Sequence, residues 1–500
     1  MKQLDDLRKE IDRIDEEIMN LLNKRFDITN KIGTIKRAKS EQTLNKDREN
    51  DILIKALEQK NSTQTKKVYE SILDISKESQ KYNSYLLIKD ASYTYSPIIH
   101  NLFNNPYYKA LENTSLEELL ESDNYHFKGL NITNPYKSEA YEYCLKNDIE
   151  LDSYAKRTKV INLIINGEKK KAYNTDYIGF KSLLDYHNIS LDNLDVLILG
   201  NGSTSKTIEE VLKEYSCKSV HIAVRTKRND DEIYLNEITS LSNIDVVINA
   251  TSYGVYPNIE LEPLVDLSNT NTSLIIDVNY NPNRPSLALK HPNIKYINGL
   301  FMLVEQARIS EELIMDKTIS IDESINVYKN VLKQTLNFCL IGMPFSGKTT
   351  LGEILSQKYG KIFFDSDIIL KEESLSLAKL LSLGLTLKDY REYESRVIET
   401  LAFVDNAIIS TGGGVIENPS NIFFLKQKGL IIFIDTPLDI LKSRIKSDRP
   451  LVKNESDLEK LFEKRYNIYK ENADIIFKCS GNLDQDAKNL EALINEYFNN

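Results

Sequence analysis

Residues 342–349 of the chain read GMPFSGKT, and this stretch decides the fold of the last third of the sequence. Its spacing is G-x-x-x-x-G-K-[ST], and it lies between an apolar run at 337–341 and an amphipathic helical pattern. In that context the glycines let backbone N–H groups surround phosphate oxygens, while the ammonium group of Lys348 reaches the outer phosphates. The sequence therefore predicts an ATP-binding loop made of Gly342, Ser346, Gly347, Lys348, Thr349 and Thr350.

Outward from this loop, short apolar runs alternate with amphipathic helical patterns over two stretches, about 84–335 and 336–500. Runs of Val, Ile and Leu between helices are typical of strands that are buried on both faces. The alternation predicts α/β domains with parallel sheets, whose ligands bind at the carboxyl ends of the strands. The runs are SYLLI (84–88), VLILG (196–200), VHIAV (220–224), DVVINA (245–250), LIIDV (274–278), NFCLIG (337–342), IFFD (362–365), AIIST (407–411) and LIIFID (430–435).

Residues 1–82 follow a different pattern, which is helical throughout. Apolar residues recur at steps of three and four from Leu4 to Ile35, with Arg25 in one position of the seam. A first helix of about 35 residues would span roughly 52 Å, and shorter helices are expected at about 46–60 and 63–81. So short a segment cannot cover this long seam by itself. We therefore expect a homodimer through residues 1–82.

Composition and charge exclude several classes of protein. The 500 residues are 41% hydrophobic and 28% charged, which is ordinary for a globular protein with several domains. The net charge of −10 makes the chain a poor binder of nucleic acid or of an anionic membrane surface. The four cysteines are widely separated and form no C-x-x-C pair, so neither a disulfide framework nor a zinc site is expected. With a charged start and no long apolar run, the sequence predicts a cytoplasmic protein.

Polar residues recur after the ATP-binding loop at the ends of the predicted strands and on helices. Asp365 and Asp367 end one strand, a run of three glycines at 412–414 follows another, and Arg391 and Arg465 lie on helices. In their order and spacing these residues resemble shikimate kinase over 336–500. The resemblance implies that Thr349 and Asp365 hold Mg²⁺ and that Asp367 takes the proton of the acceptor hydroxyl. Two guanidinium groups would bind the carboxylate of shikimate, those of Arg391 and Arg465.

The same resemblance assigns roles to the remaining positions of this segment. Gly413 would line the substrate, Arg449 would close over the transferred phosphoryl group from a lid, and Arg444 would lie near the adenine. One departure is Thr386-Leu387, where the family has Gly-Glu before the aromatic–Arg pair. This departure affects the expected packing of that helix more than the expected chemistry of the kinase site.

The middle of the chain carries a glycine-poor version of a dinucleotide-binding turn. The run VLILG is followed by a polar turn, and VHIAV ends in a basic cluster where an NAD enzyme would place an acid. Cations at that position favour a 2′-phosphate, so the sequence predicts NADP. The residues expected to contact it are Gly200, Gly202, Ser203, Thr204, Ser205, Arg225, Thr226 and Lys227, with help from Arg228.

Polar clusters at 131–137 and 174–176 complete a resemblance to shikimate dehydrogenase across about 84–325. The resemblance implies that Lys137 and Asp176 form an acid–base pair at the reacting oxygen and that Asn162 fixes them. Gln306 would close the far side of the substrate ring. Asn249 and Gly299 would contact the cofactor. The carboxylate and hydroxyls would be held by Thr94, Ser96, Thr133 and Tyr280.

Arg25 leads to a third resemblance, because a cation in an apolar seam costs several kcal/mol unless an anion meets it. Its spacing to other polar residues resembles the all-helical chorismate mutase over 1–81. The resemblance implies that two carboxylates are bound by Arg8, reaching across the dimer, and by Arg25 and Arg48. Donors to the ether oxygen would be Lys36 and Gln80, while Glu49 would hold the ring hydroxyl near Ser76.

Together the resemblances imply three domains: an all-α, intertwined dimeric domain at 1–82, an α/β dehydrogenase at 84–335 and an α/β P-loop kinase at 336–500. The NADP-binding part of the dehydrogenase would lie at about 190–299. The implied protein is a trifunctional enzyme of aromatic amino-acid biosynthesis. Its substrates would be chorismate, 3-dehydroshikimate and shikimate, and its cofactors NADP(H), ATP and Mg²⁺.

In one alternative the protein has only the dehydrogenase and kinase activities. Residues 1–82 would then serve mainly to dimerise the chain and to sense an end product such as prephenate. A dehydrogenase–kinase of related polyols is a second alternative, which the paired carboxylate-binding arginines disfavour.

Overall fold

The computed structural model describes the chain at residues 2–38, 46–79, 84–122, 125, 127–241, 243–255, 259, 262–445 and 451–499. The chain divides into two compact units. Unit 1 contains Met1–Phe180 and Glu305–Ile319, and unit 2 contains Lys181–Val304 and Ser320–Asn500. Among the helices described, none is long and apolar enough to cross a membrane.

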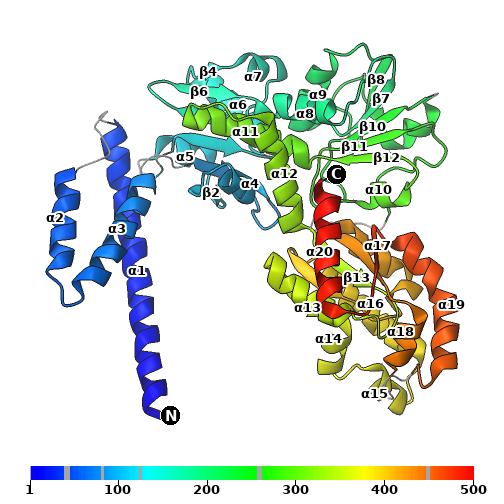
Figure 1. Ribbon diagram of the computed structural model, residues 1–500. Helices are drawn as coiled ribbons and strands as arrows, with labels where there is room; N and C mark the ends of the chain where they lie inside the picture. Colours follow the sequence, from blue (N-terminus) through cyan, green and yellow to red (C-terminus); the bar gives the residue numbers. More distant parts are fainter. Residues whose placement is uncertain are drawn as a thin grey trace. The chain divides into compact units, whose positions relative to one another are not determined.

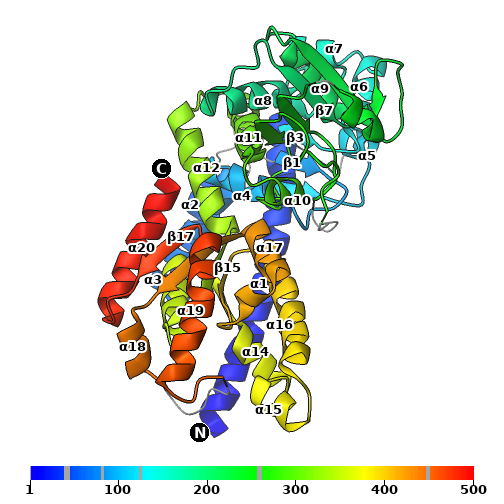
Figure 2. The same cartoon turned by 90° about the vertical axis from the view of Figure 1, so that its right-hand side faces the viewer.

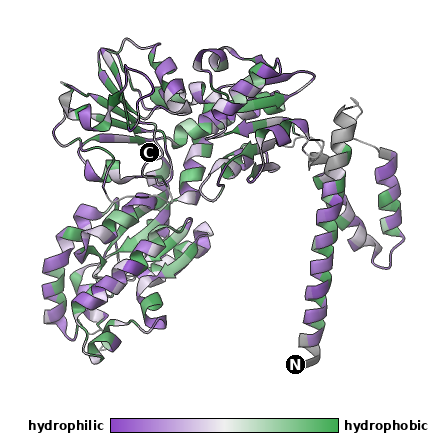
Figure 3. Cartoon of the chain, turned by 180° about the vertical axis from the view of Figure 1, so that it is seen from behind, coloured by the Kyte–Doolittle hydropathy of each residue, from purple (hydrophilic) through white to green (hydrophobic). Residues whose placement is uncertain are grey.

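Unit 1 begins with three helices, α1 (Lys2–Ala38), α2 (Lys46–Leu57) and α3 (Ser62–Ser79) (Figure 1). Helix α3 packs against both α1 and α2. The break between the second and third helices lies at 58–61, slightly before the expected position at 61–63, and the first helix has 37 residues. Figure 3 shows hydrophobic residues recurring along α1 between hydrophilic ones, as the steps of three and four predict. The expected helical N-terminal segment is therefore confirmed.

A six-stranded sheet follows in unit 1, with strand order β2-β1-β3-β5-β6-β4. Strand β1 pairs in parallel with β2 and β3, and β4 pairs in parallel with β6. The strands are β1 (Ser84–Leu87), β2 (Tyr108–Leu111), β3 (Gly129–Ile132), β4 (Glu150–Leu151), β5 (Leu163–Asn166) and β6 (Lys170–Tyr173).

The expectation of purely parallel sheets is wrong for this sheet, because β5 runs antiparallel to both β3 and β6. Strand β5 ends at Asn166 and β6 begins at Lys170, so only residues 167–169 connect them. A parallel pairing needs a crossover of about a dozen residues, whereas a link this short joins antiparallel neighbours.

Helices follow most strands of this sheet and share its core. Leu130 of β3 and Ile164 of β5 lie in one buried cluster with Leu119, Cys144 and Ala155, which come from three different helices. The helices are α4 (Ser96–Leu102), α5 (Leu116–Glu121), α6 (Lys137–Lys146), α7 (Ser153–Thr158) and the first turns of α8 (Thr175–Tyr186).

Helix α11 (Leu300–Met315) approaches β3 closely at Gly129. A Cβ atom on Gly129 would lie 2.5 Å from Cδ1 of Ile314, far inside van der Waals contact. The part of α11 that makes this contact belongs to unit 1 and also carries Gln306.

Unit 2 contains a six-stranded, entirely parallel sheet with order β12-β11-β10-β7-β8-β9. Its central strands are buried along their whole length, which explains their continuous apolar runs. The strands are β7 (Asp195–Leu199), β8 (Ser219–Val224), β9 (Ile233–Tyr234), β10 (Val246–Asn249), β11 (Leu274–Asp277) and β12 (Lys295–Asn298). The helices are α9 (Ser203–Leu212), η1 (Leu235–Ser240) and α10 (Ser286–Lys290).

Helix α12 (Ile321–Thr335) leads into a second parallel sheet of unit 2, with order β14-β15-β13-β16-β17. The strands are β13 (Asn337–Ile341), β14 (Ile362–Asp365), β15 (Ala407–Ser410), β16 (Gly429–Asp435) and β17 (Ile475–Lys478). The helices are α13 (Lys348–Tyr359), α14 (Ser366–Glu372), α15 (Leu377–Ser382), α16 (Leu387–Ala402), η2 (Val415–Glu417), α17 (Pro419–Lys428), α18 (Leu438–Ser443), α19 (Glu455–Asn472) and α20 (Leu483–Asn499).

Helices cover both faces of this sheet (Figure 2). Leu340 of β13 packs on one side with α13 and α20, whereas its neighbour Ile341 packs on the other side with α16, α17 and α19. Successive side chains of a strand point to opposite faces, so each strand contributes to both cores. The carboxyl ends of β13, β14 and β15 then lead directly to the GMPFSGKT loop, to Asp365 and to the three glycines.

Candidate active sites

The GMPFSGKT loop connects β13 to α13, as the sequence predicts. Gly342 has φ +150° and Gly347 has φ +94°, conformations that side chains with a Cβ rarely adopt. Nζ of Lys348 is buried inside the loop and donates to the carbonyl oxygens of Gly342 (3.0 Å) and Met343 (2.9 Å). The loop therefore has the curvature and the charge of a phosphate site. Thr350, the last residue expected in the ATP-binding loop, is the third residue of α13.

Thr349 and Asp365 meet beside this loop, with Oγ1 of Thr349 donating to Oδ2 of Asp365 at 2.7 Å. The other carboxylate oxygen accepts from the backbone N–H groups of Asp367 (3.0 Å) and Ile368 (3.2 Å) and so begins α14. A hydroxyl and a carboxylate oxygen are ligands that suit Mg²⁺ next to phosphates. The two predicted metal ligands thus lie together.

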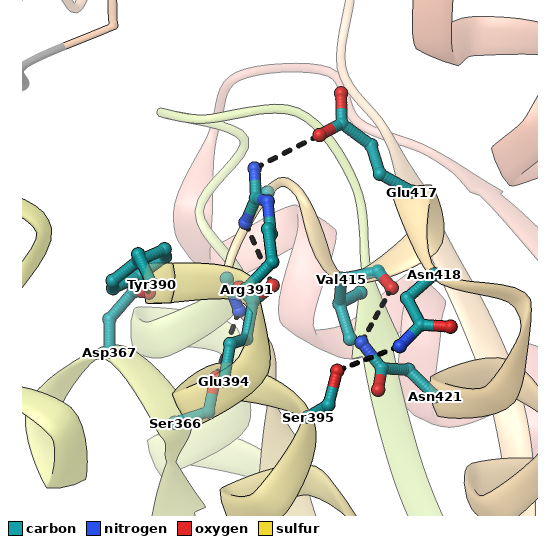
Figure 4. Close-up of polar contacts among 12 residues, drawn as sticks. Ser366, Asp367, Tyr390, Arg391, Glu394, Ser395, Val415, Glu417, Asn418 and Asn421 are labelled. Carbon is teal, nitrogen blue, oxygen red and sulfur yellow. Dashed lines mark hydrogen bonds and ion pairs between the residues drawn. The ribbon is translucent and has the colours of Figure 1, made fainter. Parts of the chain in front are cut away.

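A network of ion pairs lies where the sequence predicts the binding of a substrate carboxylate (Figure 4). Arg391 on α16 lies between two glutamates: Nη1 donates to Oε2 of Glu394 at 2.7 Å and Nη2 donates to Oε2 of Glu417 at 3.2 Å. The Oε1 atom of Glu417 accepts from Nε (3.2 Å) and Nη2 (3.1 Å) of Arg465 and from Nζ of Lys464 (2.7 Å). The two predicted carboxylate-binding arginines are thus brought together. The carboxylate that joins them belongs to the chain itself.

The charges in this network shift one another's pKa values. Burial acts to raise the pKa of Glu417, but the hydrogen bond from Lys464 and the charges of Arg465 and Arg391 outweigh it and lower that pKa. Burial raises the pKa of Glu394. Burial acts to lower the pKa of Arg391, and the two glutamates raise it above its ordinary value. Glu417, whose pKa is lowered, and Arg391, whose pKa is raised, are therefore held in their charged forms.

The three glycines let this network approach the backbone. A Cβ on Gly414 would lie 1.8 Å from Nη2 of Arg391, and a Cβ on Gly412 would lie 2.7 Å from carboxylate oxygens of Asp367 and Glu394. Gly413 faces Pro344 of the ATP-binding loop, and its carbonyl accepts a hydrogen bond from Tyr469. The glycines thus bring Asp367, Arg391 and the loop to one place.

Helix α16 holds Tyr390 and Arg391 in position despite its unusual beginning. Thr386 accepts from the N–H of Asp389, and Asp389 accepts in turn from the N–H of Thr386 at 2.7 Å. The departure at 386–387 is therefore compensated by a capping box. From α16 the hydroxyl of Tyr390 donates to Oδ1 of Asp367 at 3.4 Å. Nη1 of Arg444 donates to the carbonyl of Phe345 in the loop at 3.2 Å.

Unit 1 holds a second site, built around Lys137 and Asp176. Nζ of Lys137 lies 2.5 Å from Oδ2 of Asp176, and each side chain is only 9% exposed. Nδ2 of Asn162 donates to the other carboxylate oxygen at 3.0 Å and to Oγ1 of Thr175 at 2.9 Å. It also reaches Oε1 of Gln306 on α11 at 3.4 Å. Four residues that the sequence singled out are thus connected.

The local fold explains why this pair forms. Lys137 is the first residue of α6 and Asp176 lies in the first turn of α8, where the helix dipole stabilises a carboxylate. Thr133 directly follows β3, and its N–H donates to the carbonyl of Leu87 at 3.2 Å. Thr94 and Ser96 lie at the start of α4, with their hydroxyls 3.2 Å apart.

In unit 2, the glycine-poor turn after β7 begins helix α9 as predicted. Gly200 has φ +96°, and a Cβ there would lie 3.0 Å from the side chain of Thr251. Gly202 caps α9 and has open space around its Cα, and Oγ of Ser205 donates to the carbonyl of Gly200 at 2.7 Å. Ser203 and Thr204 form the first turn of α9. Their N–H groups open a helix that can receive a phosphate.

The residues of the basic cluster after β8 have different contacts, and one of them, Arg228, connects the cluster to the turn after β7. Arg225 is exposed, and its guanidinium stacks over the ring of Tyr253 at 5.8 Å. Lys227 contacts Glu237 at 3.6 Å, and the carbonyl of Thr226 accepts from Nδ2 of Asn201. Nη1 of Arg228 donates to the carbonyl of Asn201 at 3.1 Å, so Arg228 links the two loops directly.

The remaining predicted residues of this half lie at neighbouring strand ends. Nδ2 of Asn249, at the end of β10, donates to Oδ2 of Asp277 at 3.0 Å. Burial raises the pKa of Asp277 to about 6, although hydrogen bonds from Asn249 and Asn279 oppose the shift. A Cβ on Gly299 would lie 2.0 Å from the carbonyl oxygen of Val278, so this glycine is required by close backbone packing. Tyr280 follows β11 and is half-buried.

In the N-terminal helices, Nη1 of Arg25 on α1 donates to Oγ of Ser76 on α3 at 2.5 Å. Burial lowers the pKa of Arg25, and the charge of Arg48 adds to that shift. Arg8 is exposed on α1, and Arg48 and Glu49 lie in the first turn of α2. Of the other predicted residues, Gln80 and Arg449 lie outside the described residues, and for Lys36 only the helical backbone is described.

Sequence reasoning missed Glu417. It is a single acidic residue on the short 3-10 turn η2, and its partners Arg391 and Arg465 lie 26 and 48 positions away in the sequence. Its only signal is that it follows the three glycines closely.

Comparisons with known proteins agree with the three segments. A family model described as "Shikimate kinase" matches residues 344–495, and one described as "Chorismate mutase type II" matches residues 7–81. A "Shikimate dehydrogenase (NADP(+))" of Clostridium beijerinckii is 31% identical over 245 residues, which cover 46% of this chain and 90% of that protein. A "Shikimate kinase" of Clostridium botulinum is 37% identical over 159 residues, which cover 31% of this chain and 94% of that protein.

A solved structure titled as a chorismate mutase/shikimate 5-dehydrogenase fusion protein from Clostridium acetobutylicum is 27% identical, with a TM-score of 0.45 over 50% of this chain and 97% of that one. Along the chain, a helical segment is followed by a domain with a parallel sheet of the kind that binds dinucleotides, and then by a P-loop domain of the kinase type. It belongs to the shikimate dehydrogenase and shikimate kinase families and carries a chorismate mutase type II segment at its N-terminal end.

Proposed function

We propose that the chain catalyses three reactions of aromatic amino-acid biosynthesis. These are the rearrangement of chorismate to prephenate, the NADPH-dependent reduction of 3-dehydroshikimate to shikimate and the ATP-dependent 3-phosphorylation of shikimate. The observation that carries the proposal is the buried Lys137–Asp176 pair, because it is a complete acid–base device in the segment matched by the dehydrogenases.

In the dehydrogenase, bound NADPH supplies the hydride. Lys137 donates a proton to the carbonyl oxygen of the substrate, and Asp176 orients the ammonium group. Asn162 holds the carboxylate of Asp176 through its second oxygen. The carboxylate and hydroxyls of the substrate would be positioned by Thr94, Ser96, Thr133 and Tyr280, and Gln306 would close the far side of the ring.

The residues around the turn after β7 fit NADP. The N–H groups at the start of α9 would receive the pyrophosphate, and Arg225 would bind the 2′-phosphate. Arg225 suits this role because it is exposed and already stacked on Tyr253, so an adenine-bearing ligand would find a planar cation in place. Thr226, Lys227, Asn249 and Gly299 would line the same cofactor.

In the kinase, phosphoryl transfer depends on positioning and charge stabilisation. Lys348 and the loop N–H groups would hold the outer phosphates of ATP, while Thr349 and Asp365 would hold Mg²⁺. Asp367 would accept the proton of the shikimate hydroxyl. Arg391 and Arg465 would bind the shikimate carboxylate, with Gly413 beside the ring, Arg444 near the adenine and Arg449 on a lid.

The mutase reaction is unimolecular and requires no nucleophile. Catalysis would consist of selecting the reactive conformer and stabilising the breaking C–O bond. Arg25 and Arg48 of one chain and Arg8 of the partner would bind the two carboxylates. Lys36 and Gln80 would donate to the ether oxygen, and Glu49 would hold the ring hydroxyl.

A homodimer through residues 1–82 belongs to this proposal. In a single chain, large apolar residues along α1 remain exposed, for example 56% of Ile11 and 64% of Leu21. From Leu7 to Leu21 they are spaced three and four residues apart, as in helices that pair along a seam. A second copy of α1 presents a matching stripe by symmetry. The stripe consists of Leu7, Ile11, Ile14, Ile18, Leu21 and Ile28.

We place the functional segments at 1–82, 84–335 and 336–500, as the sequence indicates. Shikimate produced by the second activity is the substrate of the third. The test is to assay the purified full chain separately for each reaction, with each substrate given alone. Absence of one activity, with the other two present, would remove that segment from the proposal.

A further inference from the structure

Glu417 occupies the position in the kinase site where a substrate carboxylate is expected. Its two carboxylate oxygens bridge Arg391 and Arg465, which is the bidentate arrangement that two guanidinium groups offer to a bound carboxylate. The side chain of Glu417 is 17% exposed, and that of Arg465 is 3% exposed. The contact is therefore inside the site and not on an open surface.

We propose that Glu417 is an internal competitor of the substrate: in the free chain it occupies the arginine pair, and the carboxylate of shikimate has to displace it. This inference rests on the proposed kinase function. If Glu417 competes in this way, it is a determinant of substrate affinity. The more stable the ion pairs of Glu417 with the two arginines are, the weaker the binding of shikimate is.

The arginine pair retains capacity for a second acceptor. Among the described residues, Nε of Arg391 is a buried donor with no hydrogen-bond acceptor. A guanidinium offers five N–H donors, and a buried donor left without a partner is costly. A substrate carboxylate placed on Arg391 would be able to satisfy it.

Glu417 is also placed so that it can leave. It is the last residue of η2, a turn of three residues directly after the glycines, and its N–H donates to the carbonyl of Gly414 at 3.0 Å. Lys464, which shares its Oε1 atom, is 62% exposed and therefore lies on the solvent side of the pair. The carboxylate would keep this partner as it turns outward, so its charge is not left unpaired.

The energetic consequence follows from competition. If the free chain holds Glu417 on the arginines for about nine-tenths of the time, the apparent dissociation constant of the substrate is raised about tenfold. Removing the charge of Glu417 should therefore tighten binding of the substrate, whereas loss of an ordinary substrate-contacting residue weakens it.

The experiment compares the wild-type full chain with Glu417→Gln, which keeps the size of the side chain and removes its charge. We expect KM for shikimate to fall roughly tenfold, with kcat and KM for ATP within about twofold of wild type. Glu417→Asp keeps the charge on a shorter side chain and should lie between the two. The control is Glu491→Gln, which removes a glutamate that pairs with Lys358 on the outer helices and should change nothing.

A second arm uses the methyl ester of shikimate, which has no carboxylate to compete for the arginines. With the ester, the ratio of KM between wild type and Glu417→Gln should be close to one. An unchanged or higher KM for shikimate in Glu417→Gln, with KM for ATP unchanged, would overturn the inference and leave the kinase function intact. If Glu417→Gln does not fold, the same comparison with Glu417→Asp decides. A wild-type chain that does not phosphorylate shikimate would instead remove the proposed function itself.

Discussion

Nζ of Lys137 lies 2.5 Å from Oδ2 of Asp176, with both side chains almost completely buried. Two opposite charges in such surroundings are stable only as a pair, because each compensates the desolvation of the other. Asn162 donates to the second carboxylate oxygen, so the carboxylate has one orientation. The geometry thus presents one ammonium group with a fixed direction, as proton donation to a substrate requires.

Replacing Lys137 by Ala should suppress reduction of 3-dehydroshikimate with either nicotinamide cofactor. Loss of a positioned general acid commonly lowers the rate by roughly 10²–10⁴-fold. Steady-state kinetics of the dehydrogenase reaction measures the loss, and ATP-dependent phosphorylation by the same sample reports that the chain is intact. Undiminished kcat in the variant would contradict the assignment of Lys137.

Replacing Lys348 by Ala should abolish ATP-dependent phosphorylation and leave shikimate oxidation with NADP⁺ unchanged. The buried ammonium group supplies charge inside the loop, and loss of one such group costs on the order of 10²–10³-fold in rate. A matched control is Lys358→Ala, which lies on the same helix and pairs with Glu491. Retained kinase activity in Lys348→Ala would disprove the phosphate-loop assignment.

Replacing Arg225 by Asp should narrow or reverse the preference for NADP⁺ over NAD⁺. The substitution exchanges a partner of the 2′-phosphate for a partner of the ribose hydroxyl, and a charge-assisted contact of this kind is worth roughly 10- to 100-fold in affinity. The ratio of kcat/KM for the two cofactors is the measurement. Lys213→Gln, at the residue directly after helix α9 of the same half, should leave the ratio as it is. Equal use of both cofactors by the wild type would show that the basic cluster has another role.

The sequence located the buried strands well, because a strand covered on both faces is a continuous apolar run. All nine runs became strands, from β1 to β16. The strands without such a run are β2, β4, β9, β12 and β17, which lie at an edge of a sheet, and β3, β5 and β6, which lie inside the sheet of unit 1. Edge strands are short and often charged, as in YKAL of β2 and KYIN of β12, so their sequence does not separate them from loops.

The candidate sites divide in the same way. The ATP-binding loop depends on residues with a fixed local spacing, which a sequence displays directly. Some residues of the Lys137 cluster lie 39 or more positions apart, and only the resemblance to shikimate dehydrogenase singles them out together. The contacts of Glu417 depend on tertiary structure, since η2, α16 and α19 bring its partners together. No local pattern marks a carboxylate that meets two arginines only after folding.

Lys361 should make the stability of the kinase segment depend on pH. Its Nζ donates to the carbonyls of Gln334 (3.3 Å) and Leu336 (2.8 Å), and burial lowers its pKa from 10.5 to about 7. Above pH 7 the unfolded chain still holds this proton whereas the folded chain has lost it, so the free energy of unfolding rises with pH. Relative to Lys361→Met, the wild type should gain up to about 1.4 kcal/mol per pH unit between pH 7 and 9. Denaturant unfolding at several pH values measures the difference, and a constant difference would mean that the pKa of Lys361 is not lowered.

Arg25 should be essential for the mutase reaction and dispensable for the fold. Its contact with Ser76 links α1 and α3. The cation nevertheless lies in an apolar seam, where burial is unfavourable until the carboxylate of the substrate binds. Arg25→Ala should therefore lose conversion of chorismate to prephenate, with a free energy of unfolding equal to or above that of wild type. A variant that unfolds yet is active when stabilised would show that Arg25 is only a structural partner of the helix pair.

Mixing two inactive variants tests whether each mutase site is shared between chains. Arg8→Ala and Arg25→Ala should each be inactive alone, because every site then lacks one arginine. In a twofold dimer that takes Arg8 from one chain and Arg25 from the other, a mixed dimer contains one site without either arginine and one site with both. After unfolding and refolding an equal mixture, half of the dimers are mixed, so about a quarter of the wild-type mutase activity should return. No recovery, with both variants confirmed as dimers by sedimentation, would mean that each site is built from one chain. A wild-type chain without mutase activity whose kinase or dehydrogenase responds to prephenate would instead favour a sensing role for residues 1–82.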